Sequence, residues 1–175
     1  MKYSDKLLSK NLFETEEPKY HIINMTNYLC EFIDKQYKIV ITQEFRKQVV
    51  DDALEHYKLH VEAYDVPVNG IDPYKFISWI GMGLYTKAIE KYNETVSDSI
   101  LKSTIIVMNR TLIEEGRMLP KFYLKKIFGM VKNDHIGKEH LGLGKNGLYL
   151  VFRSASLCLL EDSKYEIEED VEIER

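Results

Sequence analysis

The uncharged stretch from Phe76 to Tyr85 constrains the fold most, because it combines high hydrophobicity with the only tryptophan of the chain. At 100° per residue its apolar side chains surround a helix on all sides, which is typical of a buried helix. The stretch is too short to cross a bilayer, which takes about 20 apolar residues. We therefore predict that residues 72–92 form a buried central helix, with Asp72 as its N-cap and Pro73 in its first turn.

Small residues lie along one side of this predicted helix, at Ser78, Gly81 and Ala88, together with Tyr85. A glycine inside a helix costs roughly 1 kcal/mol relative to alanine, and the stretch contains two of them. Such a cost indicates that the packing of the helix requires small residues at these positions. We therefore expect another helix, either residues 97–115 or one from a second subunit, to approach this side closely.

Apolar residues that recur at three- and four-residue steps predict five further helices. These cover residues 19–36, 43–64, 97–115, 120–133 and 148–160. We expect Thr42 to cap the helix that follows it. Thr95 or Ser97 should cap the next predicted helix, which Gly116 should end as a left-handed residue. Residues 37–41 are short and β-branched, so the sequence leaves open whether they are extended.

The predicted fold class is all-α: a single-domain bundle of about six helices around the buried central helix, with a glycine-rich loop and an acidic C-terminal tail. Short connections favour an antiparallel up-and-down arrangement. We divide the chain into a polar N-terminal arm at 1–18, a helical domain at 19–160 and the acidic tail at 161–175. Apolar residues in the tail stand at odd positions, as in a strand that forms on docking: Tyr165, Ile167, Val171 and Ile173.

Composition narrows the class of protein. The formal net charge of −4 argues against general nucleic-acid binding, which usually requires a basic surface. Cys30 and Cys158 lack a CxxC partner, which favours two free thiols in a reducing compartment. The first ten residues contain no apolar signal segment, so we expect a cytoplasmic protein without a membrane anchor. Frequent Lys, Ile, Asn and Tyr indicate an AT-rich bacterial or phage genome.

Asp52, His56 and His60 form the first candidate site, because their four-residue spacing puts them in one row along the helix at 43–64. Two histidines at i, i+4 can share a divalent ion such as zinc, iron or manganese. The glutamate of an HExxH motif is absent, so the next ligand would be a carboxylate or another histidine: His21, His135 or His140. In the alternative, one histidine is hydrogen-bonded in the core and the other lies at the surface.

The glycine-rich loop at residues 134–147 is the second candidate. Three of its glycines spell GxGxxG, but a dinucleotide-binding fingerprint follows a strand, and here a helix is predicted before it. We therefore predict no dinucleotide site. Lys138 and Lys145 beside the N-terminus of the last helix would suit an anion. In the alternative, Asn146 caps that helix and the glycines only form its turn.

The distribution of charge supplies the third candidate. Between Arg117 and Lys145 seven basic residues oppose two acidic ones, a net charge of +5, whereas residues 161–175 carry a net charge of −6. Besides Lys132, the basic residues are the expected contacts to an anion or nucleic acid: Arg117, Lys121, Lys125, Lys126, Lys138 and Lys145. The tail can cover this basic segment until a polyanion or a partner displaces it. In the alternative, the two surfaces never meet.

No Ser-His-Asp or Cys-His arrangement has a recognisable spacing, so we predict no catalytic residue and no cofactor other than a divalent metal. The favoured hypothesis is a small cytoplasmic binding or regulatory protein that acts through a macromolecular partner, above all a protein, without chemistry of its own. One alternative is a metal-dependent hydrolase that uses Asp52, His56 and His60. The second is a nucleic-acid-associated protein that uses the basic segment 117–145 and is gated by the acidic tail. A homo-oligomer is compatible with each of these.

Overall fold

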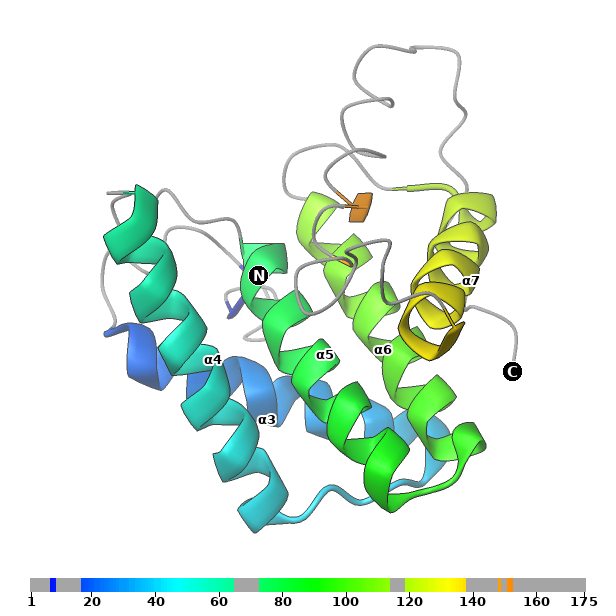
Figure 1. Cartoon of the computed structure of the whole chain (residues 1–175), viewed down its shortest axis with the longest axis horizontal. Helices are drawn as coiled ribbons and strands as arrows, with labels where there is room; N and C mark the ends of the chain where they lie inside the picture. Colours follow the sequence, from blue (N-terminus) through cyan, green and yellow to red (C-terminus); the bar gives the residue numbers. More distant parts are fainter. Residues whose placement is uncertain are drawn as a thin grey trace, which may run out of the picture.

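The computed structural model describes residues 7–8, 17–64, 73–113, 119–137, 148 and 151–152. Within these residues the chain is all-α and contains no strand, which confirms the all-α part of the predicted fold class. The five helices (Figure 1) are α3 (Pro18–Tyr37), α4 (Gln43–Tyr64), α5 (Pro73–Lys91), α6 (Glu94–Ile113) and α7 (Lys121–Gly137). None of these five is long and apolar enough to cross a membrane.

The first two helices agree with the prediction to within a residue. α3 ends at Lys38, which takes the left-handed conformation with a φ of 59° and donates its N–H to the carbonyl oxygen of Asp34 at 2.8 Å. α4 follows Thr42, whose Oγ1 accepts the N–H of Phe45 at 3.3 Å, so the predicted N-cap is confirmed. Residues 38–42 are neither helix nor strand, so the β-branched segment is a connection.

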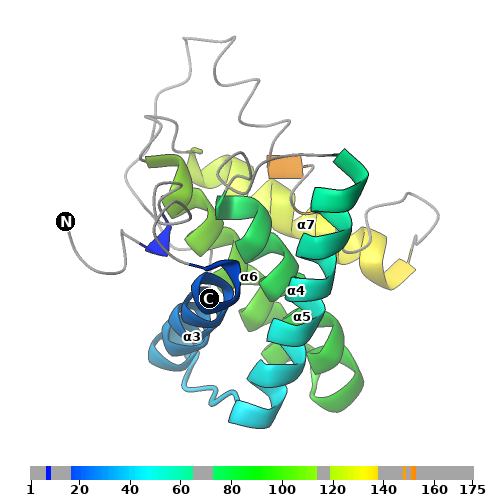
Figure 2. The same cartoon turned by 90° about the vertical axis from the view of Figure 1, so that its left-hand side faces the viewer.

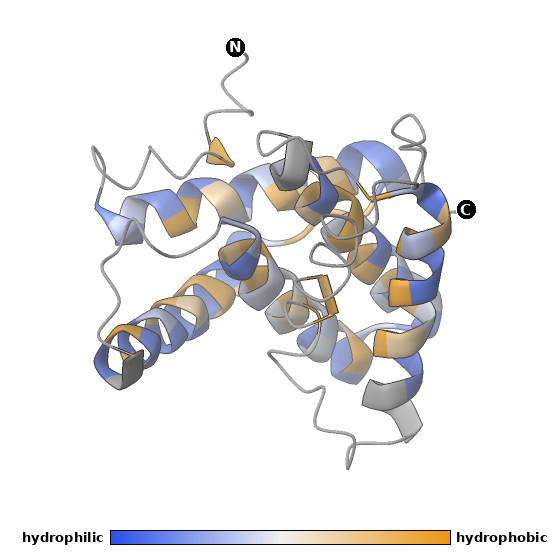
Figure 3. Cartoon of the chain, turned by 90° about the horizontal axis from the view of Figure 1, so that it is seen from above, coloured by the Kyte–Doolittle hydropathy of each residue, from blue (hydrophilic) through white to orange (hydrophobic). Residues whose placement is uncertain are grey.

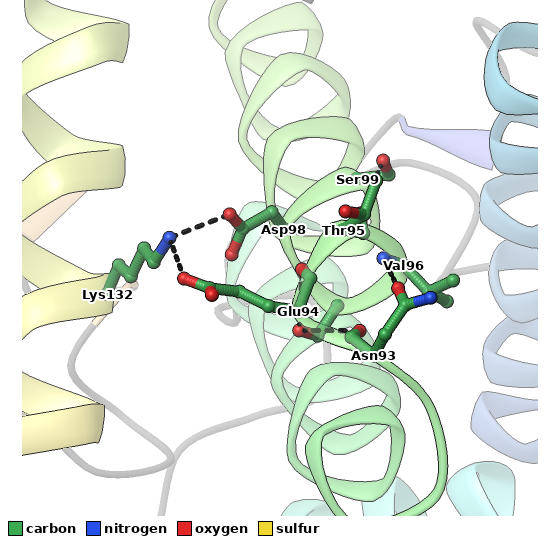
Figure 4. A network of polar contacts seen from close by, with 8 residues as sticks. Asn93, Glu94, Thr95, Val96, Asp98, Ser99 and Lys132 are labelled. Atoms are coloured by element: carbon green, nitrogen blue, oxygen red, sulfur yellow. Dashed lines mark hydrogen bonds and ion pairs between the residues drawn. The ribbon is translucent and has the colours of Figure 1, made fainter.

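The start of α6 differs from the prediction. Asn93 is the N-cap in place of Thr95 or Ser97, because its Oδ1 accepts the N–H of Val96 at 3.0 Å (Figure 4). Asparagine caps a helix as well as serine or threonine does. Only Tyr92 and Asn93 separate α5 from α6. The first residue able to cap α6 therefore lies earlier in the chain than the apolar periodicity indicates.

Some predicted features lie outside the described residues and stay predictions: the caps Asp72 and Gly116, the loop beyond Gly137, and the acidic tail 161–175. α7 itself continues past Asn133, its predicted end, to Gly137. The predicted last helix is described only at 148 and 151–152, where two side chains are buried. Two leucines of the arm that the sequence predicts to be polar are buried as well, Leu7 and Leu8.

The helices α4, α5 and α6 form a layer whose members alternate in direction (Figure 1). α3 runs across this layer on one side, where it contacts all three helices (Figure 2). α7 lies at the edge of the molecule and packs against α6. Hydrophobic and hydrophilic residues alternate along the outer helices (Figure 3), as expected of helices with one buried face.

The helix α5 is the buried centre of this arrangement, as the sequence predicts. Every residue from Phe76 to Tyr85 is buried. A Cβ atom added to Gly81 would overlap the side chain of Thr104 in α6. The close approach that the small residues predict is therefore observed within the chain, with α6 as the neighbouring helix.

Candidate functional site

The predicted row of Asp52, His56 and His60 lies on α4 where this helix faces the first turns of α5. The His56 Nε2 atom is 3.7 Å from the Asp52 Oδ2 atom. Both histidine rings contact the indole of Trp79 with ring centroids 5.9 Å apart, His56 in a stacked and His60 in an edge-on arrangement. The structure thus brings both histidines to one aromatic ring.

The ring of His60 faces the ammonium group of Lys75. The Lys75 Nζ atom is 3.2 Å from the His60 Nδ1 atom and 5.6 Å from the centre of the Trp79 ring. Burial and the charge of Lys75 lower the pKa of His60, so this imidazole is neutral and accepts a hydrogen bond at neutral pH. A metal ion at His60 would have to approach beside this positive charge.

In the described part of the chain, no group of three or more His, Cys, Asp or Glu residues is placed to hold a metal ion. His21 is fully buried on α3. The side chain of His135 and the whole of His140 lie outside the described residues. A metal site at Asp52, His56 and His60 therefore stays a prediction, and its remaining ligand is still unassigned.

Three of the six basic residues predicted to contact a partner are described, all on α7. Lys125 and Lys126 are exposed and Lys121 is half-buried. Lys132, also on α7, instead turns toward α6. The other three predicted contacts lie outside the described residues: Arg117, Lys138 and Lys145.

The ammonium group of Lys132 lies 2.7 Å from the Asp98 Oδ2 atom and 2.7 Å from the Glu94 Oε1 atom (Figure 4). Hydrogen bonds to Asp98 and Glu94 raise the pKa of Lys132, and the hydrogen bond from Lys132 lowers the pKa of Glu94. The charge of Lys132 is therefore neutralised within the chain. The sequence overestimates the positive charge that α7 offers to a partner, because both acids belong to another helix.

Two large apolar side chains of α7 point to the outside. Phe122 is 63% exposed and Met130 is 44% exposed. Together with the exposed Lys126 they stand at i, i+4 and i+8, so they form one row along the helix. We call the outward side of α7 the outer face, which consists of the half-buried Gly129 and five exposed residues: Phe122, Lys125, Lys126, Met130 and Asn133.

The outer face exists because the predicted apolar stripe of α7 occupies the opposite side. Leu124, Ile127 and Val131 are buried, and α7 packs against α6. Sequence reasoning missed Phe122 and Met130, since a single exposed apolar residue is ordinary in a soluble protein. Their common spacing with Lys126, opposite the stripe, is the signal that could have found them.

Comparison of the chain with family models, with curated proteins and with solved structures finds no match. The inference of function therefore depends on the side chains themselves. Of the two candidates in the described residues, the histidine row is largely covered by contacts within the chain. The outer face of α7 presents two of the exposed large apolar side chains of the described residues, Phe122 and Met130, in one row with a lysine.

Proposed function

We propose that the protein is a small helical binding protein that acts through a protein partner, with the outer face of α7 as its contact surface and no chemistry of its own. The observation that supports this most is the row of Phe122, Lys126 and Met130, which exposes an apolar side chain on each side of a lysine. Apolar residues at helical spacing are the anchors by which a helix enters a groove of another protein. The complementary partner surface is apolar, with acidic groups opposite Lys126.

Gly129 gives independent support for close contact at this face. A Cβ atom added to Gly129 would meet no atom within 4 Å, so packing within the chain does not require glycine there. A helix-interior glycine is about 1 kcal/mol less favourable than alanine. Its missing side chain leaves the backbone accessible between Phe122 and Met130, where a partner can approach closely.

A protein partner fits this face better than a nucleic acid does. Lys132 is already paired with two carboxylates, and the row itself contains one lysine between two apolar side chains. Nucleic-acid binding depends mainly on several phosphate contacts and falls steeply with salt. A gated nucleic-acid-binding protein remains the alternative, and the experiment below separates the two.

We further infer a cytoplasmic protein of bacterial or phage origin whose residues 19–160 form one domain of about six helices. Leu148 and Phe152 support the sixth helix at 148–160, because both are buried and they stand four residues apart. The polar arm and the acidic tail would flank this domain.

A photo-crosslinking amino acid placed at Phe122 in the full chain tests the proposal in cells that express the protein. The captured partner is then purified, and its Kd is measured with the parent and with variants. We expect Phe122→Ser and Met130→Ser each to weaken binding at least about tenfold, as loss of an apolar anchor does.

Leu59→Ser is the matched control, because Leu59 is 54% exposed on α4, away from α7. It should leave the Kd unchanged. Equal Kd values for Phe122→Ser and the parent would overturn the proposal. So would capture of a nucleic acid whose binding to the purified protein falls steeply with salt.

A further inference from the structure

We propose that the acidic tail at residues 161–175 binds the outer face of α7 within the same chain and competes there with the partner. The inference rests on the proposed function, since it assigns a regulator to the same surface. Charge, spacing, reach and the accessible backbone at Gly129 support this contact.

The charges of the two segments are complementary. The tail carries a net charge of −6 over 15 residues. On the outer face, Lys126 is exposed between Phe122 and Met130. An acidic segment that also contains apolar residues can satisfy all three side chains, whereas a purely acidic segment would satisfy only the lysine.

The spacing of the two patterns also matches. Successive members of the row Phe122, Lys126 and Met130 rise about 6 Å along the helix axis. In an extended segment, alternate residues lie on one side about 6.6 Å apart. Ile167, Glu169 and Val171 are such alternate residues, so the order apolar, acidic, apolar faces the order apolar, basic, apolar.

The tail can reach this face. Phe152 is buried in the domain, and eight residues, 153–160, connect it to the start of the tail. As part of the helix proposed at 148–160 they span about 12 Å, and residues 161–166, when extended, add up to about 20 Å. A domain of this size has a radius of gyration of about 16 Å, so much of its surface lies within that reach.

The accessible backbone at Gly129 suits an extended ligand. No atom lies within 4 Å of a Cβ added at this position, which stands on the outer face between the anchors of the row. An extended chain laid along the helix can approach the backbone at glycine more closely than at a residue with a side chain. The tail then excludes a partner in proportion to the fraction of molecules in which it is bound.

The first test uses nitrogen-15 spectra of the full chain, with the amide of Gly129 as the reporter. Glu169→Lys should shift this signal. Asp170→Lys is the matched control, because it changes the charge equally at the adjacent residue, on the opposite side of an extended segment. We expect it to leave the Gly129 signal close to that of the parent, at every protein concentration.

Zero-length carbodiimide cross-linking gives a second measurement of the same contact. An amide bond between Lys126 and Glu169, located by mass spectrometry, is expected in the parent and absent in Glu169→Lys. The exchanged variant, Lys126→Glu with Glu169→Lys, should restore a cross-link between these two positions. Equal shifts of the Gly129 amide signal in Glu169→Lys and Asp170→Lys, or no shift in either variant, would overturn the inference.

A labelled peptide of residues 161–175, added to the full chain, measures competition. If the tail covers nine-tenths of the outer faces, the peptide should bind the Glu169→Lys variant about tenfold more tightly than the parent. Phe122→Ser in the Glu169→Lys background should abolish this binding. Equal binding to the parent and to Glu169→Lys would contradict an internal competitor.

The two proposals can fail separately. If Phe122→Ser abolishes partner binding while the spectra of Glu169→Lys and the parent agree, the proposed function stands and the tail inference fails. If the peptide binds the outer face while the captured partner binds Phe122→Ser as it binds the parent, the tail contact stands and the proposed function fails.

Discussion

At Gly81 the approach of two helices leaves no room for any side chain. A Cβ atom there would overlap the side chain of Thr104, which donates its own hydroxyl to the carbonyl oxygen of Ile100. This hydrogen bond within α6 therefore leaves the Thr104 side chain little freedom to move. The tolerance of α5 to substitution should differ sharply between its two glycines.

We predict that Gly81→Ala and Gly81→Leu lower the free energy of unfolding by about 1–3 kcal/mol through overpacking. Gly83→Ala is the control, because its Cβ would lie 3.4 Å from the Val49 Cγ1 atom, close to ordinary contact. Urea unfolding of the three variants gives the comparison. If Gly81→Ala is as stable as Gly83→Ala, the contact between α5 and α6 is looser than described.

Ser78, on the same helix, is fully buried, and its hydroxyl has no hydrogen-bond partner among the described residues. We predict that Ser78→Ala stabilises the protein by about 1 kcal/mol, since it removes a desolvated polar group. Ser103→Ala is a matched control, because Ser103 is equally buried but donates to the carbonyl oxygen of Ser99 at 2.8 Å. Thermal or urea unfolding that shows Ser78→Ala to be less stable than the parent would contradict this prediction.

His21 should make the stability depend on pH. Burial lowers the pKa of its imidazole to about 4, below the value of about 6.5 expected in the unfolded chain. Below pH 6.5 the unfolded chain binds a proton at His21 that the folded chain does not bind until the pH is near 4. The free energy of unfolding therefore falls with pH in this range, by about 2 kcal/mol between pH 7 and pH 5. Urea unfolding at both pH values should show this loss in the parent and not in His21→Gln. The same loss in both proteins would refute it.

At the scale of the elements, apolar periodicity predicted well those helices that bury a single apolar face. The bounds of α4 were predicted to the residue, and α3 to within one residue, because caps and apolar positions agree there. The start of α6 was wrong, since Asn93 precedes the first apolar position by several residues. The local sequence contains no signal that decides between neighbouring residues that cap equally well.

The candidate site was predicted only in part. Lys126 was identified as a contact from the charge of its segment, but the anchors Phe122 and Met130 were not, since exposure depends on how α7 is rotated against α6. The pairing of Lys132 with Asp98 could not be predicted either, because it joins residues 34 positions apart in the sequence. Tertiary packing, and not local pattern, settles both.

α7 is also the element in which stability and binding should oppose each other. We predict that Gly129→Ala raises the stability of the folded chain by up to about 1 kcal/mol, because nothing lies within 4 Å of the added methyl group. The same change should weaken partner binding, because it fills the space between the anchors. Unfolding and Kd measurements on one preparation test both parts. Unchanged affinity in a stabilised variant would show that the glycine has no role in contact.

At the scale of the molecule, the buried centre and the proposed contact surface are different helices. α5 contacts α3, α4 and α6, whereas α7 packs against α6 at the edge. Substitutions on the outer face of α7 should therefore change binding without unfolding the domain. Lys132 strengthens this separation, because its ion pairs hold α7 to α6 through a residue outside the outer face.

The position of Trp79 has a practical consequence. The single indole lies 4% exposed between α4 and α5, with two imidazoles against its ring. Its emission therefore reports whether these two helices are packed together. Occupation of α7 should leave that emission unchanged, whereas unfolding should shift it to longer wavelength. An optical titration of the unlabelled protein can thus distinguish a variant that no longer binds from one that no longer folds.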